Sequence, residues 1–145
     1  MNIFAHIYKR QNRRRSQKEF EARLNEMGLH FPLFCKAHAV KSPERQGALA
    51  QSRDGDNLQL VHTPTEEYPF CITIYSIPLN RILGYLGVEL SEKLVHAFGE
   101  GFCCDGEIEN VTGGPPYKYY GCNLRIMDTQ ELFEDIEDIL ALYGE

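Results

Sequence analysis

The sequence predicts an α+β fold, with a mainly antiparallel sheet of about five or six strands and helices packed on one face. Three observations lead to this prediction. Short segments rich in β-branched and aromatic residues recur between turn residues, as strands do. Amphipathic stretches with capping residues predict helices near both ends of the chain. Asp105-Gly106, a pair typical of tight turns, lies between two strand-like segments.

The first third of the chain predicts a strand, a helix and a second strand. Residues 2–8 alternate well enough for a strand. Ser16 and Glu19 form a capping box for a helix that ends at Gly28, because glycine readily takes the left-handed conformation that terminates helices. Residues 31–40 then predict a second strand.

Residues 41–57 are polar and contain proline and glycine, so we expect a flexible polar loop at 41–57. The elements after this loop are predicted from β propensity, helical spacing and turn residues. They are strands at 58–62 and 70–75, helices at 78–87 and 91–99, a hairpin over 101–111, a turn at 113–116 and a strand at 117–127. A length of 145 residues fits one domain, so we expect a single α+β domain over 1–145.

The terminal helix has the clearest signals. Asp128 is placed to cap it, with Glu131 at the reciprocal position of a capping box. Its apolar side chains fall within about 120° of the helical wheel. The carboxylates of Glu131, Glu134, Asp135 and Asp138 fall on the opposite side.

Charge is sorted along the chain. Residues 9–18 carry six bases and no acid, whereas residues 128–145 carry seven acids and no base. Apart from that basic strip, nine bases face 21 acids. An acidic body repels phosphate polymers and membrane surfaces and attracts basic proteins. These charges therefore favour a basic protein partner, make nucleic acid an unlikely one, and predict no membrane association.

The acids of the terminal helix oppose helix stability, which suggests that something else favours them. Glu131 and Asp135 are like charges four residues apart, a pair that destabilises a helix by roughly 0.2–0.5 kcal/mol. Two readings need no partner: a solvated acidic face, or pairing with Arg13–Arg15 of the same chain. The third reading is a docking surface for a basic protein.

Candidate catalytic residues are few. Cys35 and His38 have a spacing suitable for two metal ligands, but no paired knuckle accompanies them, and on a strand they point to opposite faces. A cysteine–histidine nucleophile pair stays open, because such partners meet in space rather than in sequence. We expect no cofactor and no metal, and we read the five cysteines as reduced thiols of a cytoplasmic protein.

In size, acidity and lack of catalytic motifs the chain resembles bacterial immunity proteins, although the resemblance covers no specific residue. It implies an acidic inhibitor that covers the active cleft of a basic toxin or nuclease. The residues predicted to bind this partner are Glu131, Glu134, Asp135 and Asp138, with Tyr117, Tyr119 and Tyr120. The alternatives are a small enzyme or ligand-binding domain with a site near Cys35, His38 or His96, and nucleic-acid contact through the basic strip at 9–18.

Overall fold

The computed structural model describes residues 17–134 and residue 137. Contacts divide the chain into two compact units: Pro32–Met127, and Met1–Phe31 together with Asp128–Glu145. The predicted strand at 2–8 and most of the basic strip lie outside the described residues. The prediction of one domain over 1–145 stays a prediction.

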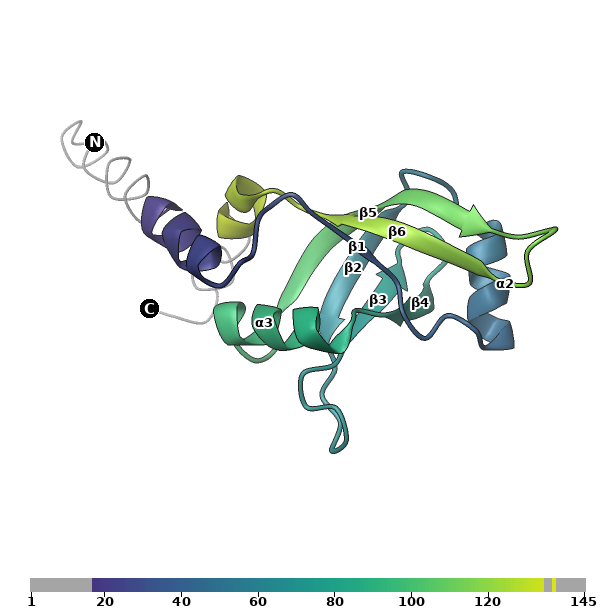
Figure 1. Cartoon of the computed structure of the whole chain (residues 1–145), viewed down its shortest axis with the longest axis horizontal. Coiled ribbons are helices and arrows are strands. Elements are labelled where there is room, and N and C mark those ends of the chain that lie inside the picture. Colours follow the sequence, from purple (N-terminus) through teal and green to yellow (C-terminus); the bar gives the residue numbers. More distant parts are fainter. Residues whose placement is uncertain (1–16, 135–136, 138–145) are drawn as a thin grey trace, which may run out of the picture. The chain divides into compact units, whose positions relative to one another are not determined.

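Pro32–Met127 forms one six-stranded sheet (Figure 1). Its strands are β1 Leu33–Lys36, β2 Asn57–His62, β3 Ile72–Ser76, β4 Arg81–Tyr85, β5 Cys103–Gly113 and β6 Tyr120–Ile126. They lie in the order β1-β6-β5-β2-β3-β4, and every neighbouring pair is antiparallel. The prediction of an α+β fold with a mainly antiparallel sheet is confirmed.

Alternate residues of the central strands fill the core. Leu58 and Leu60 of β2 are completely buried, as are Leu124 and Ile126 of β6. The residue between the first two, Gln59, is exposed. Because successive side chains of a strand point to opposite faces, this alternation buries one face of the sheet and leaves the other to solvent.

The sheet curls until its two outer strands meet at one point. Past the end of β1, His38 and Tyr85 exchange both backbone hydrogen bonds, with N···O distances of 2.8 and 2.9 Å. Gly84 makes this approach possible, because an added Cβ would overlap the His38 carbonyl oxygen. The contact joins β1 to β4, and we call it the closure.

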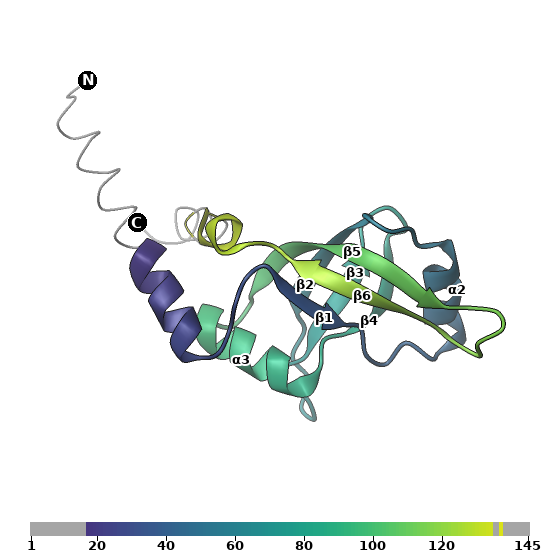
Figure 2. The same ribbon diagram turned by 45° about the horizontal axis from the view of Figure 1, so that its top comes forward.

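A helix replaces most of the flexible loop expected at 41–57. α2 spans Pro43–Gln51, and the Ser42 hydroxyl caps it by accepting a hydrogen bond from the backbone N–H of Arg45. The helix contacts β4 and β6, at the end of the sheet where the β5–β6 hairpin turns (Figure 2). Leu49 is completely buried there. Since only Ala48 and Leu49 of this helix are buried, the helix has a weak apolar pattern that sequence periodicity misses.

Two further predictions are wrong. Residues 81–85 form strand β4 where a helix over 78–87 was predicted, because the turn at Ile77–Asn80 folds the chain back onto β3. Asp105-Gly106 lies inside the continuous strand β5 and makes no hairpin turn. Gly106 serves packing instead, since an added Cβ would lie 2.9 Å from the Arg125 carbonyl oxygen of β6.

The predicted helix at 91–99 is present but starts earlier. α3 spans Val88–Phe98, with Gly87 at the N-cap and Gly99 at the end. Ser91, expected at the cap, lies instead within the first turns of the helix, where its hydroxyl donates to the Leu86 carbonyl oxygen at 3.4 Å. The predicted turn at 113–116 is confirmed as the link between β5 and β6.

The second unit contains two helical segments, and Ser16, the predicted N-cap of the first, lies outside the described residues. Residues 17–26 are helical, and Gly28 follows with a φ of 75°. Residues 129–134 are helical, and Asp128 and Glu131 each bond the other's backbone N–H, at 2.9 and 3.1 Å. Among the described residues, none of the helices has the length and apolar character needed to cross a membrane.

Candidate functional site

A pocket of about 460 Å³ opens beside the closure, within Pro32–Met127. Three chain segments line it: the closure itself, the β2–β3 connection and the start of α3. We call it the candidate pocket. The side chains that give it chemical character are His38, Thr65, Glu67, Tyr68, Phe70 and Tyr85.

The β2–β3 connection is held in a fixed shape by its own hydrogen bonds. The Thr65 hydroxyl accepts from the Tyr68 N–H at 3.0 Å, and the Tyr68 carbonyl accepts from the Thr65 N–H at 3.1 Å. The buried His62 side chain also holds the connection, through hydrogen bonds at both of its ring nitrogens. Its Nδ1 accepts from the Gly101 N–H at 3.0 Å, so the ring proton lies on Nε2 and is donated to the Pro69 carbonyl at 2.8 Å.

The closure supplies the second wall. Ala39 follows it with a φ of 57°, and its carbonyl accepts from the Arg45 guanidinium at 2.6 Å. A second Arg45 nitrogen donates to the Tyr85 hydroxyl at 2.9 Å, and the guanidinium carbon lies 4.5 Å from the centre of the Tyr85 ring. This contact fixes the Tyr85 ring and leaves its own O–H proton without an acceptor among the described residues.

The start of α3 forms the third wall. Gly87 lies under the His38 imidazole, so that an added Cβ would be 3.2 Å from Nε2. Val88 is 68% exposed and adds apolar surface. Further along α3, the His96 ring packs on the Phe70 ring with their centres 5.0 Å apart. His38 and His96, both predicted as site residues of a ligand-binding domain, therefore lie at this pocket or directly behind it.

The residues that line the pocket include both aromatic and polar side chains. Tyr68 is 57% exposed, so its ring is accessible to a ligand in the pocket. The Glu67 carboxylate accepts hydrogen bonds, while the Thr65 hydroxyl and the His38 imidazole both donate and accept them. This combination can bind a flat ring by stacking and by hydrogen bonds at its edge.

Cys35 is unsuited to catalysis. Burial, with a smaller contribution from nearby Cys122, raises the pKa of the Cys35 thiol to about 12. Burial also raises the pKa of Cys122 to about 11. Because the thiolate is the nucleophile, these raised pKa values favour the unreactive neutral thiol of both side chains at neutral pH. Within the part of the chain that the structure describes, no cluster of histidine, cysteine and acidic side chains could hold a metal ion.

The residues predicted to bind a basic partner belong to two different compact units. Glu131 and Glu134 belong to one compact unit, and Tyr117, Tyr119 and Tyr120 to the other. Asp135 and Asp138 lie outside the described residues. Glu131 is exposed but already bonds the Asp128 N–H as part of the capping box. The acidic inhibitor of a basic toxin or nuclease stays a prediction.

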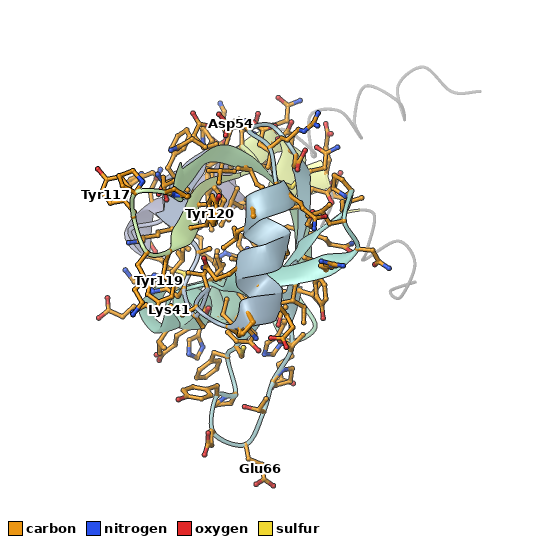
Figure 3. The ribbon with its side chains drawn as sticks, turned by 90° about the vertical axis from the view of Figure 1, so that its right-hand side faces the viewer. Lys41, Asp54, Glu66, Tyr117, Tyr119 and Tyr120 are labelled. Carbon is orange, nitrogen blue, oxygen red and sulfur yellow. The ribbon has the colours of Figure 1, made fainter. Side chains whose placement is uncertain are left out.

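Of the three tyrosines, Tyr119 is the one that lies beside lysines, and Figure 3 shows it next to Lys41. The ammonium nitrogens of Lys41 and Lys118 lie 5.2 and 5.3 Å from the centre of the Tyr119 ring. Tyr117, next in the hairpin, is 73% exposed. We call Lys41, Tyr117, Lys118 and Tyr119 the tyrosine–lysine tip. Its charge is opposite to the charge that a basic partner would require.

Sequence reasoning missed the candidate pocket. The only available signal was Glu67-Tyr68-Pro69-Phe70, an aromatic pair with a carboxylate in a turn between two strands. Recognising it requires knowing that the closure and the start of α3 lie opposite that turn. Comparisons with known proteins add no assignment: no family model, no curated protein and no solved structure matches this chain.

Proposed function

We propose that this protein is a binding module that holds a flat, polar-edged aromatic ring, such as a nucleobase, in the candidate pocket. The observation that supports it most is the convergence of Tyr68, Phe70 and Tyr85 on one pocket of about 460 Å³. Pockets for small ligands typically have volumes of about 300–1,000 Å³ and are lined mainly by apolar and aromatic groups.

Polar groups among the aromatic residues favour a ring with hydrogen-bonding edges over a plain hydrocarbon. Glu67 offers a carboxylate and Thr65 a hydroxyl on one wall, and His38 offers an imidazole on the other. Burying these groups against a hydrocarbon would leave them without partners, which costs about 1–3 kcal/mol for each. A ring bearing both donors and acceptors avoids that cost.

Binding, rather than catalysis, fits the chemistry of the pocket walls. The aromatic rings, the Arg45-supported Tyr85 and the internally bonded β2–β3 connection form a prearranged surface. A rigid pocket loses little conformational entropy when its ligand enters.

Titration of the protein with nucleosides, with indole as the apolar comparison, tests the proposal by following amide shifts in NMR spectra. We expect nucleosides to shift amides of residues 65–71 and 85–88 and to bind more tightly than indole. The Tyr68→Ala variant should weaken binding about tenfold, since stacking a base on an aromatic side chain is worth about 1–3 kcal/mol.

Tyr75→Ala is the matched control, because Tyr75 lies on β3 and does not line the pocket. Its affinity for nucleosides should equal that of the unmodified protein. The proposal fails if no nucleoside shifts the pocket amides, if indole binds as well as the nucleosides do, or if Tyr68→Ala and Tyr75→Ala behave alike.

A further inference from the structure

The tyrosine–lysine tip is a second exposed feature, built from residues that the candidate pocket does not use. It lies on the β5–β6 hairpin, with Lys41 contributed by the segment that leads into α2. Figure 3 shows Lys41, Tyr117 and Tyr119 on one side of α2, whereas the carboxylates of Asp54 and Glu66 lie elsewhere on the molecule.

The side chain of Gln46 in α2 holds the hairpin in place. Its Nε2 donates to the Val40 carbonyl at 2.7 Å and to the Tyr120 carbonyl at 2.9 Å, and its Oε1 accepts from the Tyr120 N–H at 2.8 Å. The amide thus bonds Tyr120 as a neighbouring strand would. It also ties the hairpin to the backbone just before Lys41, so all four residues of the tip are supported by one fixed framework.

The charges of the tip are not neutralised within the described structure. Both ammonium groups lie against the same Tyr119 ring, at 5.2 and 5.3 Å from its centre. Neither lysine forms an ion pair with a carboxylate of residues 17–134 or 137. A cation against an exposed ring gains about 0.5–1 kcal/mol. Both ammonium groups can also attract an anionic group that approaches the exposed tip.

We propose that the tyrosine–lysine tip docks an acidic segment of a partner protein. Carboxylates of such a segment would accept hydrogen bonds from the two ammonium groups and from the hydroxyls of Tyr117 and Tyr119. Tyrosine also provides the large, rigid contact area that dominates protein interfaces. The 73% exposure of Tyr117 leaves that area open.

The size and surroundings of the tip favour an acidic protein segment over a phosphate polymer. Two cations neutralise few phosphates, whereas binding to a nucleic acid gains affinity from many such contacts. The net charge of −6 repels a long polyanion over the remaining surface. A short acidic segment contacts only the tip, so the rest of the acidic surface repels it less.

Fluorescence anisotropy with a labelled polyglutamate peptide at low salt tests the proposal. The double variant Lys41→Glu with Lys118→Glu should lose at least about tenfold in affinity, because each lysine then repels the peptide. Tyr117→Phe, which keeps the ring but loses the hydroxyl, should weaken binding less, by about threefold. Binding should also weaken as salt is raised.

The matched control is Lys36→Glu with Lys93→Glu, which changes the net charge equally at two exposed lysines outside the tip. It should leave most of the affinity intact. Circular dichroism first confirms that both double variants are folded. Equal loss of affinity in the two double variants overturns the proposal, as does the absence of peptide binding at low salt. Tighter binding of a labelled single-stranded oligonucleotide than of the peptide, lost only in the tip variant, overturns it in favour of nucleic acid.

Discussion

The candidate pocket and the tyrosine–lysine tip both place aromatic side chains at the surface, but they differ in shape and in the chain segments that build them. The pocket is concave and is assembled from three segments, of which the one at His38 and Ala39 reaches the other two through the closure. The tip is exposed and comes from one hairpin, supplemented by Lys41. We infer that the pocket depends on the global closure of the sheet, whereas the tip depends on local charge and on one glutamine.

The largest expected difference comes from breaking the closure. Gly84→Val places a side chain where the His38 carbonyl lies, so the His38–Tyr85 backbone pair cannot form. We expect a loss of about 3 kcal/mol in the free energy of unfolding, measured by urea denaturation, because overpacking and lost hydrogen bonds add. Ligand binding in the pocket should vanish while peptide binding at the tip persists. If both sites fail together in the folded variant, the tip is not independent of the closure.

Removing the Gln46 side chain, which holds the hairpin, should loosen the tyrosine–lysine tip and leave the candidate pocket unchanged. Gln46→Leu leaves the N–H and carbonyl of Tyr120 without their side-chain partner. The expected cost is about 2 kcal/mol in the free energy of unfolding. Hydrogen exchange of the Tyr120 amide, followed by NMR, should accelerate, while pocket amides keep their rates. Unchanged exchange at Tyr120 would contradict the role given to Gln46.

A smaller effect concerns the thiols of β1 and β6. Burial raises the pKa of Cys35 from 9.0 to about 12, so the folded protein keeps this proton between those pH values while the unfolded chain releases it. The contribution of the neutral Cys35 thiol to the free energy of unfolding is therefore fully present below pH 9 and declines as the pH rises toward 12. Each pH unit removes up to about 1.4 kcal/mol.

Chemical denaturation at pH 8 and pH 10 measures this decline. Cys35→Ala should lose less stability than the unmodified protein between the two pH values, because it has no thiol to titrate. Equal losses in the two proteins would show that the Cys35 environment is open to water.

The smallest expected change is a gain. Gly47 lies inside α2, and nothing stands within 4 Å of an added Cβ there. Gly47→Ala should raise the free energy of unfolding by about 0.5–1 kcal/mol, since alanine favours a helix over glycine. Urea denaturation measures the gain, and both binding sites should keep their affinities. A loss of stability would indicate that α2 is packed more tightly around Gly47 than its contacts show.

Local signals predicted the parts of the structure that depend on neighbouring residues. Gly28 ends a helix and Asp128 pairs with Glu131 as expected, because a cap is formed by residues within one turn. The same reasoning failed at 78–87, where apolar spacing favoured a helix and pairing with β3 made a strand. It failed again at Asp105-Gly106, whose turn preference yields to pairing with both β2 and β6.

By itself, the sequence determined the fold class, the Asp128–Glu131 capping box and the sorting of charge, since each depends on composition or on residues a few positions apart. Only the tertiary structure decided that residues 43–51 are helical, that Gly84 lets β1 approach β4, and that Tyr68 and Tyr85 share a pocket. The same holds for the lysines placed against Tyr119, which come from positions 41 and 118. The physical reason is that sheet register and closure bring together residues far apart in the chain, and no local propensity encodes those pairings.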